Sequence, residues 1–423
     1  MNLSRFFYSA LMLALVPLML LRLHWRARRE SLYAKAVGER LGFYRLPAQS
    51  GSVWIHAVSL GETRAVQSLV QALRQAHPTV RFVFTHGTAT GRQQGESLLQ
   101  AGDVQVWQPW DVPFVVERFL HHFQPRLGLL VDTEVWPNTV AKAKAHGLPL
   151  VLLNGRLSDK SLRKALAWSS LSQPAFQNLH AIWAQSAEDA QRFERLGAKV
   201  QAVMGNLKFD AEPDPQLLQC GLQWRAQSAL PVVLLAISRE GEESQWLQIL
   251  AEHPAYLQGV QWWVVPRHPQ RFDEVAELVL SHGRGLIRRS AWGSLPPAPE
   301  PMHDQVVLGD SLGEMPFYYG AASVCLLGGS FQPLGGQNLI EACACACPVV
   351  MGPHTFNFSE ASTLALQSGA AVRVPDMLQA VSTAHALATD AQTLTGMRVA
   401  AQGFAKQHQG AVQRCVALMA PLL

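Results

Sequence analysis

The chain has 423 residues, of which 48% are hydrophobic, so it can bury sizeable cores and we expect two domains. This composition excludes a disordered or fibrous protein. The net charge of +4 is small and much of the excess lies between Arg22 and Arg45, which argues against a nucleic-acid partner.

An uncharged apolar run from Phe6 to Leu21 opens the chain. A membrane span normally needs about 20 apolar residues, so the length of this run is marginal. A signal peptide would need small residues for cleavage after the run, but Arg22, His24 and Trp25 stand there. We therefore predict an uncleaved membrane anchor over residues 1–30, and the basic residues after the run favour the cytoplasmic side for the rest of the chain. The alternative is a helix packed on the globular body.

Short apolar runs then alternate with longer amphipathic stretches. The first five runs are "SVWIHAVS", "RFVFTHG", "LGLLVDTE", "LPLVLLNG" and "HAIWAQS". Such alternation predicts parallel strands joined by helices, and hence an N-terminal α/β domain over residues 31–210.

A polar segment with prolines, residues 211–230, interrupts this pattern, and we predict a domain linker there. The alternation resumes over residues 231–390, which predicts a second α/β domain, and residues 391–423 read as a C-terminal helix. In open parallel sheets, ligands bind at the carboxyl ends of the strands. We therefore expect the ligand crevice between the two halves.

Several common cofactor and metal signatures are missing from the sequence. No G-x-G-x-x-G follows a predicted strand, and there is no Walker A sequence, no Asp-x-Asp pair and no histidine cluster with ligand spacing. Cys343, Cys345 and Cys347 are closely spaced, but on a helix Cys345 points away from the other two, so we interpret them as small packing residues. The sequence thus indicates no metal dependence and no cofactor.

Polar residues follow several strands of the first half. Glu62 comes between the first strand and a helix predicted to start near Thr63; its carboxylate could serve as a general base or could merely stabilise the helix dipole. Asp132 and Glu134 end another strand, and Lys208 precedes the linker. For each of these residues, a solvated or paired surface charge is the alternative.

The second half carries similar strand-end residues. Arg267 and His268 end a strand, and an arginine fork suits phosphate oxygens. Gly313 and Glu314 form another strand-end turn, where helix capping is an equal alternative. The stretch "GGSFQPLGGQNLIEACA" then places paired glycines before a helix, with Asn338 near its start and Glu341 one turn later. Glycine loops of this kind can bring backbone N–H groups close to an anion, although a plain tight turn would also explain them.

Taken in order, these motifs resemble those of the 3-deoxy-D-manno-octulosonic acid (Kdo) transferases of lipopolysaccharide synthesis. The resemblance runs through "ERLGFYR", "HAVSLGE", "TEVWPN", "NGRLS", "GNLKFD", "EGEE", "PRHPQRF", "GDSLGEM", "GGSFQPLGGQN" and "MGPHTFNF". It implies an α/β GT-B glycosyltransferase fold with two Rossmann-like domains. It also implies CMP-Kdo as donor, a lipid A precursor as acceptor, and a location at the cytoplasmic face of the inner membrane.

The resemblance also implies roles for individual residues. Glu62 matches the general base of the family, and Asp132 and Lys208 match positions credited with transition-state stabilisation. The segments that hold the cytidine nucleotide match Pro266, Arg267, Leu312, Gly313, Glu314, Asn338, Leu339, Ile340 and Glu341.

The sequence departs from the family pattern at Asp132, where Glu is usual, and at Arg239 and Gln337, where His is usual. The reach of the shorter Asp132 side chain is therefore in question.

The sequence as a whole predicts an inverting, metal-independent transfer in which Glu62 deprotonates an acceptor hydroxyl. Two alternatives stay open. One is another GT-B nucleotide-sugar enzyme, either a uridine-donor transferase or an epimerase. The other is a membrane-tethered scaffold without catalytic activity. The number of Kdo residues transferred does not follow from the sequence.

Overall fold

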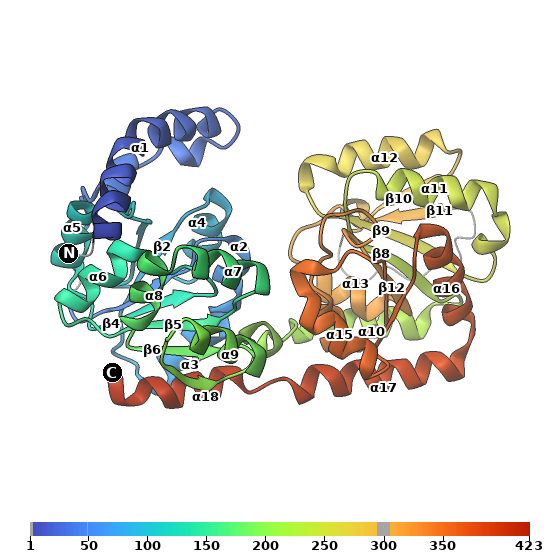
Figure 1. Cartoon of the computed structure of the whole chain (residues 1–423). Coiled ribbons are helices and arrows are strands. Elements are labelled where there is room, and N and C mark those ends of the chain that lie inside the picture. Colours follow the sequence, from blue (N-terminus) through green and yellow to red (C-terminus); the bar gives the residue numbers. More distant parts are fainter. Residues whose placement is uncertain (1–2, 49, 294–304) are drawn as a thin grey trace. The chain divides into compact units, whose positions relative to one another are not determined.

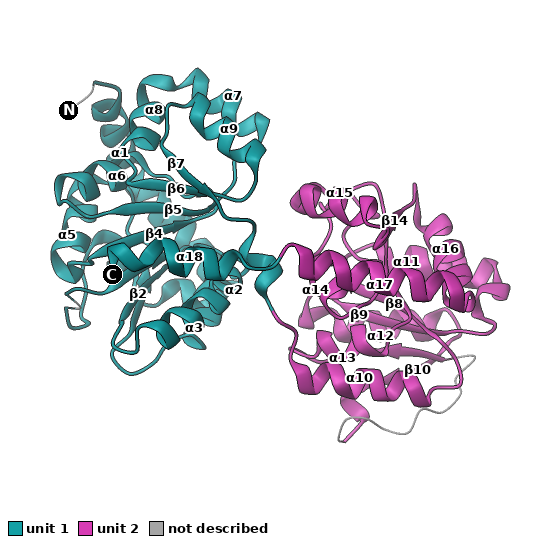
Figure 2. Cartoon of the chain, turned by 90° about the horizontal axis from the view of Figure 1, so that it is seen from below, with its two compact units in different colours: residues 1–211, 409–423 teal, residues 212–408 magenta. Residues whose placement is uncertain are grey.

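The computed structural model describes residues 3–48, 50–293 and 305–423 (Figure 1). Outside the described residues are residues 1–2, 49 and 294–304. They belong to the anchor and the two domains expected from the sequence. The chain divides into two compact units, unit 1 with residues 1–211 and 409–423, and unit 2 with residues 212–408 (Figure 2).

Unit 1 contains a seven-stranded sheet in the order β3-β2-β1-β4-β5-β6-β7, and all of its strand pairs are parallel. Its strands are β1 (Val53–His56), β2 (Phe82–His86), β3 (Val104–Trp107), β4 (Leu127–Val131), β5 (Leu150–Gly155), β6 (Ala181–Ala184) and β7 (Val200–Val203). The central strands β1, β4 and β5 are buried at every position, as expected for a parallel sheet covered on both faces.

Helices cover both faces of this sheet. Val53 and Ile55 of β1 point into one core together with α3 (Gln67–Ala76) and α18 (Ala411–Met419), whereas Trp54 points into the other core. The helices on the Trp54 side are α5 (Pro113–Phe123), α6 (Pro137–Ala145), α7 (Asp159–Ala167) and α9 (Ala187–Arg195). The remaining α-helices of the unit are α1 (Leu3–Ala27), α2 (Leu60–Ala65), α4 (Ala89–Glu96) and α8 (Ser169–Gln177).

Unit 2 repeats this plan with a seven-stranded parallel sheet in the order β10-β11-β9-β8-β12-β13-β14. Its strands are β8 (Val232–Ser238), β9 (Gln261–Pro266), β10 (Gly285–Arg288), β11 (Gln305–Leu308), β12 (Val324–Leu327), β13 (Val349–Met351) and β14 (Ala371–Arg373). Its helices are α10 (Pro215–Gln227), α11 (Glu242–Glu252), α12 (Phe272–Ser281), α13 (Met315–Ala321), α14 (Leu339–Ala344), α15 (Ser359–Gln367), α16 (Met377–Thr389) and α17 (Ala391–Gln407).

The segment 211–230, expected to be a linker, is largely helix α10 of unit 2. Asp214 caps this helix through the backbone N–H groups of Gln216 and Leu217, and Pro215 occupies its first position. The polar residues and prolines that suggest a linker are thus the start signal of a helix. This helix packs closely on α13: a Cβ at Gly221 would lie only 2.3 Å from the carbonyl oxygen of Phe317.

The C-terminal segment 391–423, expected as one helix, is divided between the units. Helix α17 lies in unit 2, and the chain returns to unit 1 after residue 408. There α18 buries Val412 and Cys415 in the same core as β1. The return of the chain to unit 1 could not be predicted from helical periodicity, because periodicity indicates that one face of a helix is buried but not what it packs against.

Helix α1 (Leu3–Ala27) is long and apolar enough to cross a membrane, judged by length and composition. One of its faces nevertheless packs on unit 1, where Met12, Val16 and Met19 meet Trp110 and Val112. The opposite face leaves large apolar side chains exposed, among them Phe6, Phe7, Leu18, Leu21 and Trp25. One face of the helix thus agrees with the interpretation of a helix packed on the body, and the other face keeps the apolar surface that a membrane contact would need.

Candidate functional site

The first group of candidate residues lies at a topological switch point of the unit 1 sheet. Strands β1 and β4 are neighbours, but β2 and β3 extend the sheet on one side and β5 to β7 extend it on the other. Crevices for ligands form at the carboxyl ends of strands at such a point. Glu62 follows β1, and Asp132 and Glu134 follow β4, so the strand order brings together residues that are far apart in the sequence.

Glu62 lies in the first turn of α2, which begins at Leu60 and not near Thr63 as predicted. Ser59 caps the helix, and its hydroxyl donates to Glu62 Oε1 at 2.8 Å, while the backbone N–H of Val58 donates to Oε2 at 2.7 Å. This Ser-x-x-Glu pattern is a capping box, which explains the earlier helix start. The carboxylate is held in one orientation and is only partly buried.

The surroundings of Glu62 favour its protonated form. Burial, and to a smaller extent the negative charge of Asp132, raise the pKa of Glu62 to about 7, against the hydrogen bonds from Ser59 and Val58, which lower it. A carboxylate that titrates near neutrality can accept a proton and release it again at physiological pH. The helix-capping role and a role in proton transfer are therefore both open to this side chain.

Asp132 has a left-handed backbone conformation with a φ of 60°, which is uncommon outside glycine. Its Oδ1 accepts a hydrogen bond of 2.6 Å from the Nδ2 of Asn154, the penultimate residue of β5. Glu134, two residues later, accepts from Trp136 Nε1 at 2.8 Å, and burial raises the pKa of Glu134. Three carboxylates thus gather at the ends of β1 and β4.

Lys208 lies in a short 3-10 helix, η3 (Leu207–Asp210), which follows β7. Asn206 caps this turn by accepting from the backbone N–H of Lys208 at 3.0 Å, and Leu207 N–H donates to Asn154 Oδ1 at 3.0 Å. The turn that carries Lys208 is therefore tied to the same residue that holds Asp132.

Sequence reasoning missed the amide residues Asn154, Gln185 and Asn206, although each of them ends an apolar run in the printed sequence. It also missed His56, the last residue of β1. Burial lowers the pKa of His56 to about 3, so this imidazole is neutral at pH 7, with Nδ1 2.7 Å from Thr85 Oγ1 and Nε2 3.9 Å from Glu134 Oε2. A polar residue at the end of a buried strand was the signal that could have identified His56, Asn154 and Gln185, whereas Asn206 follows β7, which is half-buried or exposed.

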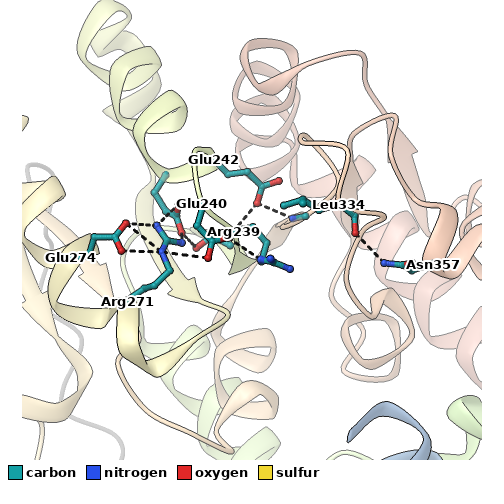
Figure 3. Close-up of polar contacts among 10 residues, drawn as sticks. Arg239, Glu240, Glu242, Arg271, Glu274, Leu334 and Asn357 are labelled. Atoms are coloured by element: carbon teal, nitrogen blue, oxygen red, sulfur yellow. Dashed lines mark hydrogen bonds and ion pairs between the residues drawn. The ribbon is translucent and has the colours of Figure 1, made fainter. Parts of the chain in front are cut away.

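The switch point of unit 2 lies between β8 and β12. Two buried carboxylates follow β8 there (Figure 3). Glu242 accepts from the backbone N–H groups of Arg239, Gly329 and Phe331 at 2.9, 2.8 and 3.2 Å. Glu243 receives the two-pronged guanidinium of Arg271 at 2.7 and 3.2 Å. Both carboxylates thus hold strand-end loops together inside the protein.

Positive charge gathers at the same edge. Pro266 is the buried last residue of β9, and the backbone N–H of Arg267 donates to Ser238 O at 3.0 Å. Burial, followed by the guanidinium charges of Arg239 and Arg267, lowers the pKa of His268. Arg239 and Arg267, which follow β8 and β9, thus act on the same imidazole, and we call them the basic group. Arg239 Nε also lies 3.1 Å from Glu240 Oε2, which pairs with its charge.

In the turn at residues 312–314, the carboxylate of Glu314 is already paired inside the protein. Glu314 stands before α13, accepts from Arg289 Nη2 at 2.8 Å and accepts from Ser311 Oγ at 2.5 Å. Gly313 has a φ of 80° with open space around it, and the side chain of Leu312 is 73% exposed. Leu312 and Gly313 are therefore the accessible part of this turn.

Helix α14 begins after Asn338, as the sequence predicts, and Asn338 Oδ1 caps it through Ile340 N–H at 3.1 Å. The side chains of Leu339 and Ile340 are in the core, which leaves only their backbone for a ligand, whereas Glu341 is partly buried in the first turn. The sequence alone did not distinguish the buried side chains of Leu339 and Ile340 from the more accessible ones of Asn338 and Glu341.

The glycines of the loop before α14 have a packing role as well. A Cβ at Gly328 would lie 2.2 Å from Ile237 O, and one at Gly335 would lie 2.4 Å from Asn357 Nδ2. Asn357 in turn donates to Leu334 O at 3.0 Å (Figure 3). The N–H groups of Gly329 and Gly336 are used inside the protein, by Glu242 and by Gly329 O. Close packing of this loop is therefore a structural reason for these glycines, beside the predicted approach of an anion.

Within the described ranges, Glu117, His121 and His146 have ligand atoms that all lie within 4.8 Å of one another. The sequence did not reveal this group because it joins two helices. Lys142 Nζ already lies 2.6 Å from Glu117 Oε2, so the carboxylate is paired with a cation. Cys343, Cys345 and Cys347 are buried and carry free thiols, as small packing residues do.

Comparison with known proteins identifies the family. A family model described as 3-deoxy-D-manno-octulosonic-acid transferase (kdotransferase) matches residues 35–211. The 3-deoxy-D-manno-octulosonic acid transferase of Bordetella pertussis is 44% identical over 420 residues, covering 96% of both chains. The enzyme of the same name from Haemophilus influenzae is 31% identical over 437 residues, covering 99% of both chains.

The fold comparison agrees with the two parallel α/β sheets. The crystal structure of a glycosyltransferase from Rickettsia africae is similar with a TM-score of 0.57 and 11% identity, covering 90% of this chain and 99% of that one. The predicted α/β fold of the GT-B class is confirmed. With its similarity extending over almost the whole sequence, the chain belongs to the 3-deoxy-D-manno-octulosonic acid transferase family.

Proposed function

We propose that this chain transfers Kdo from CMP-Kdo to a lipid A precursor, without a metal ion and with inversion at the anomeric carbon, and that Glu62 is the general base. The observation that carries the proposal is the setting of Glu62: a fixed carboxylate at the switch point of unit 1, with a pKa raised to about 7. The names of the full-length relatives supply the reaction class.

In the proposed step, the Glu62 carboxylate takes the proton of an acceptor hydroxyl while that oxygen bonds to the anomeric carbon of Kdo. The bond from this carbon to the phosphate oxygen breaks, and CMP leaves with the electron pair. Glycosyl transfer of this kind passes through a state with positive charge on the sugar, which the carboxylate of Asp132 would stabilise. Lys208 would meet negative charge on the departing phosphate.

On the donor side, we propose that unit 2 holds the cytidine nucleotide. The basic group after β8 and β9, which includes Arg267, supports binding of the phosphate. The accessible parts of residues 312–314 and 338–341 would contact the nucleoside, through side chains at Asn338 and Glu341 and through backbone at Leu339 and Ile340. Preorganised donors aimed at developing charge are worth about 2.7 to 4 kcal/mol each.

The acceptor is a lipid, and α1 supports delivery of unit 1 to the membrane that contains it. The exposed apolar face of α1 ends at Trp25, and Arg26, Arg28 and Arg29 follow. Apolar contact with lipid tails and attraction to anionic headgroups would then act together on the cytoplasmic side of the inner membrane.

The test is a transfer assay with purified protein, CMP-Kdo and a lipid A precursor, with mass spectrometry of the product. The wild type should add Kdo, and Glu62→Gln should lose about 10²- to 10⁴-fold in kcat while it keeps its affinity for CMP. Competition between cytidine and uridine nucleotides separates this function from a uridine-dependent enzyme of the same fold. Absence of transfer by the wild type, or near-normal turnover by Glu62→Gln, would contradict the proposal.

A further inference from the structure

Two adjacent strands of unit 1 end in unusual backbone geometry. β4 and β5 pair in parallel with Val131 opposite Leu153, and the next residue on each strand, Asp132 and Asn154, has a positive φ, 60° and 56°. Neither is glycine, so the conformation has an energetic cost, although Asp and Asn tolerate it better than other residues. Strained residues of this kind cluster at functional sites, where the surroundings hold them in place.

The side chain of Asn154 is fully buried and uses both ends of its amide. Nδ2 donates to Asp132 Oδ1 at 2.6 Å, and Oδ1 accepts from Leu207 N–H at 3.0 Å. An amide turned by 180° would place an oxygen against the carboxylate and an NH₂ against an N–H group, so the partners fix its orientation. Aspartate or leucine, which have similar shapes, could not make both bonds.

Two further amide side chains complete the network. Gln185 Nε2 donates to the carbonyl oxygen of Asn154 at 2.9 Å, and Gln185 Oε1 accepts from Asn206 Nδ2 at 3.2 Å. Asn206 in turn accepts from the N–H of Lys208. The path from Asp132 to the turn of Lys208 thus runs through neutral amides, which leave the negative charge of Asp132 in place.

We infer that Asn154 is a positioning residue for the proposed reaction, because its amide holds the Asp132 carboxylate and the turn that carries Lys208 in one fixed arrangement. The inference rests on the proposed function, since the importance of this arrangement depends on the roles of Asp132 and Lys208. The alternative is that the same bonds only stabilise the loops at the end of the sheet.

The decisive variant is Asn154→Asp. Aspartate keeps the shape, tolerates a positive φ and still accepts from Leu207 N–H. Two carboxylates this close share a proton near neutral pH, so the variant is compared with the wild type at alkaline pH, where the new carboxylate is ionised and cannot donate to Asp132. We expect the wild-type KM for CMP-Kdo within about two-fold and kcat lower by roughly 100-fold, the size of effect that follows when a catalytic group is misplaced. Loss in kcat without a change in KM indicates an interaction that matters in the transition state.

Two variants frame this result. Asn178→Asp makes the same chemical change in unit 1, where Asn178 accepts from Lys144 Nζ at 2.6 Å, and it should leave kcat unchanged. Gln185→Ala removes the donor to the Asn154 carbonyl and the longer 3.5 Å contact of Gln185 Nε2 with Asp132 Oδ1, but it keeps the bond from Asn154 to Asp132. Its loss in kcat should therefore be intermediate. Gln185→Ala also keeps the inference testable if Asn154→Asp does not fold.

The readouts are kcat, KM, CMP affinity and the melting temperature of each variant. A kcat at the wild-type level in Asn154→Asp would overturn the positioning role. So would a kcat, in either variant, that falls only in proportion to the melting temperature. In both cases, transfer by the wild type would still support the proposed function. Absence of Kdo transfer by the wild type itself would instead contradict the proposed function.

Discussion

At the scale of single residues, Glu62 shows how one side chain can serve structure and chemistry together. Its hydrogen bonds with Ser59 and Val58 close the first turn of α2 and fix the carboxylate. These bonds favour the charged form, but burial and the neighbouring Asp132 outweigh them, so the pKa lies near 7. The sequence offered two interpretations for this residue, and the geometry is compatible with both.

The charge of Asp132 should therefore contribute, beside burial, to the pH dependence of transfer. Asp132→Asn removes a negative charge that raises the pKa of Glu62, so this pKa should fall towards its usual value of 4.5. A general base acts when it is deprotonated, hence the acidic limb of kcat/KM against pH should move from about 7 to lower pH. The plateau should also drop, because the proposed stabilisation of the sugar is lost.

The pH profile of the variant, measured from pH 4.5 to 9 beside the wild type, is the check on this coupling. An acidic limb that stays at the wild-type position would show that Asp132 does not act on the ionisation of the base.

At the scale of elements, helix α10 depends on glycine for its place in unit 2. A Cβ at Gly221 would meet Phe317 O at 2.3 Å and Gly320 Cα at 3.0 Å, and backbone atoms of a packed helix cannot move aside cheaply. Gly221→Ala should therefore destabilise unit 2 by about 1 to 3 kcal/mol, as overpacking does.

A matched control is Gly403→Ala in the exposed middle of α17, where a Cβ meets nothing within 4 Å. This change should stabilise its helix by about 0.5 to 1 kcal/mol. Thermal denaturation of both variants decides the matter, and a Gly221→Ala protein as stable as the wild type would argue against the close packing of α10 on α13.

Helix α1 has one face packed on the rest of unit 1 and one exposed apolar face, for which we predict a membrane contact. The double variant Phe7→Glu/Leu18→Glu places charges on the exposed face, where these side chains are 63% and 61% exposed. It should weaken sedimentation with vesicles of anionic phospholipids and leave the melting temperature unchanged. Met19→Ala, on the face packed against unit 1, should instead lower the melting temperature and leave vesicle sedimentation unchanged. Equal vesicle binding by the double variant and the wild type would rule out the exposed face as the membrane contact.

At the scale of the whole molecule, two α/β units of similar plan carry different candidate residues. Unit 1 holds the carboxylates and Lys208, and unit 2 holds the arginines. The two units should then contribute separately to kinetics. Changes in unit 1 should appear in kcat, and changes in unit 2 should appear in nucleotide affinity.

Arg267→Ala tests this separation. Loss of a charge-assisted contact with phosphate costs about 1.5 to 3 kcal/mol, so CMP affinity should fall by roughly 10- to 100-fold. Arg288→Ala is the control, since Arg288 pairs with Asp273 and Asp310 near the surface and should not affect binding. Calorimetric titration with CMP measures both, and unchanged affinity in Arg267→Ala would remove this residue from the nucleotide site.

Much of this protein could be predicted from its sequence because the signals are local. Apolar runs mark the strands, Asn338 caps a helix where expected, and the ordered motifs identify the family. Local signals can also mislead. Asp214 and Pro215 suggested a linker but begin α10, and Glu62 was placed before a helix that in fact includes it.

The sequence by itself determined the fold class, the family and the residues at the ends of strands, since periodicity, capping and motif order are properties of neighbouring positions. Tertiary structure decided which of these residues meet, because strand order places β1 beside β4 and β4 beside β5. It also decided the pKa of Glu62, the orientation of Asn154 and the packing role of Gly335. Each of these depends on burial and on atoms from distant segments, which come into contact only when the sheet has formed.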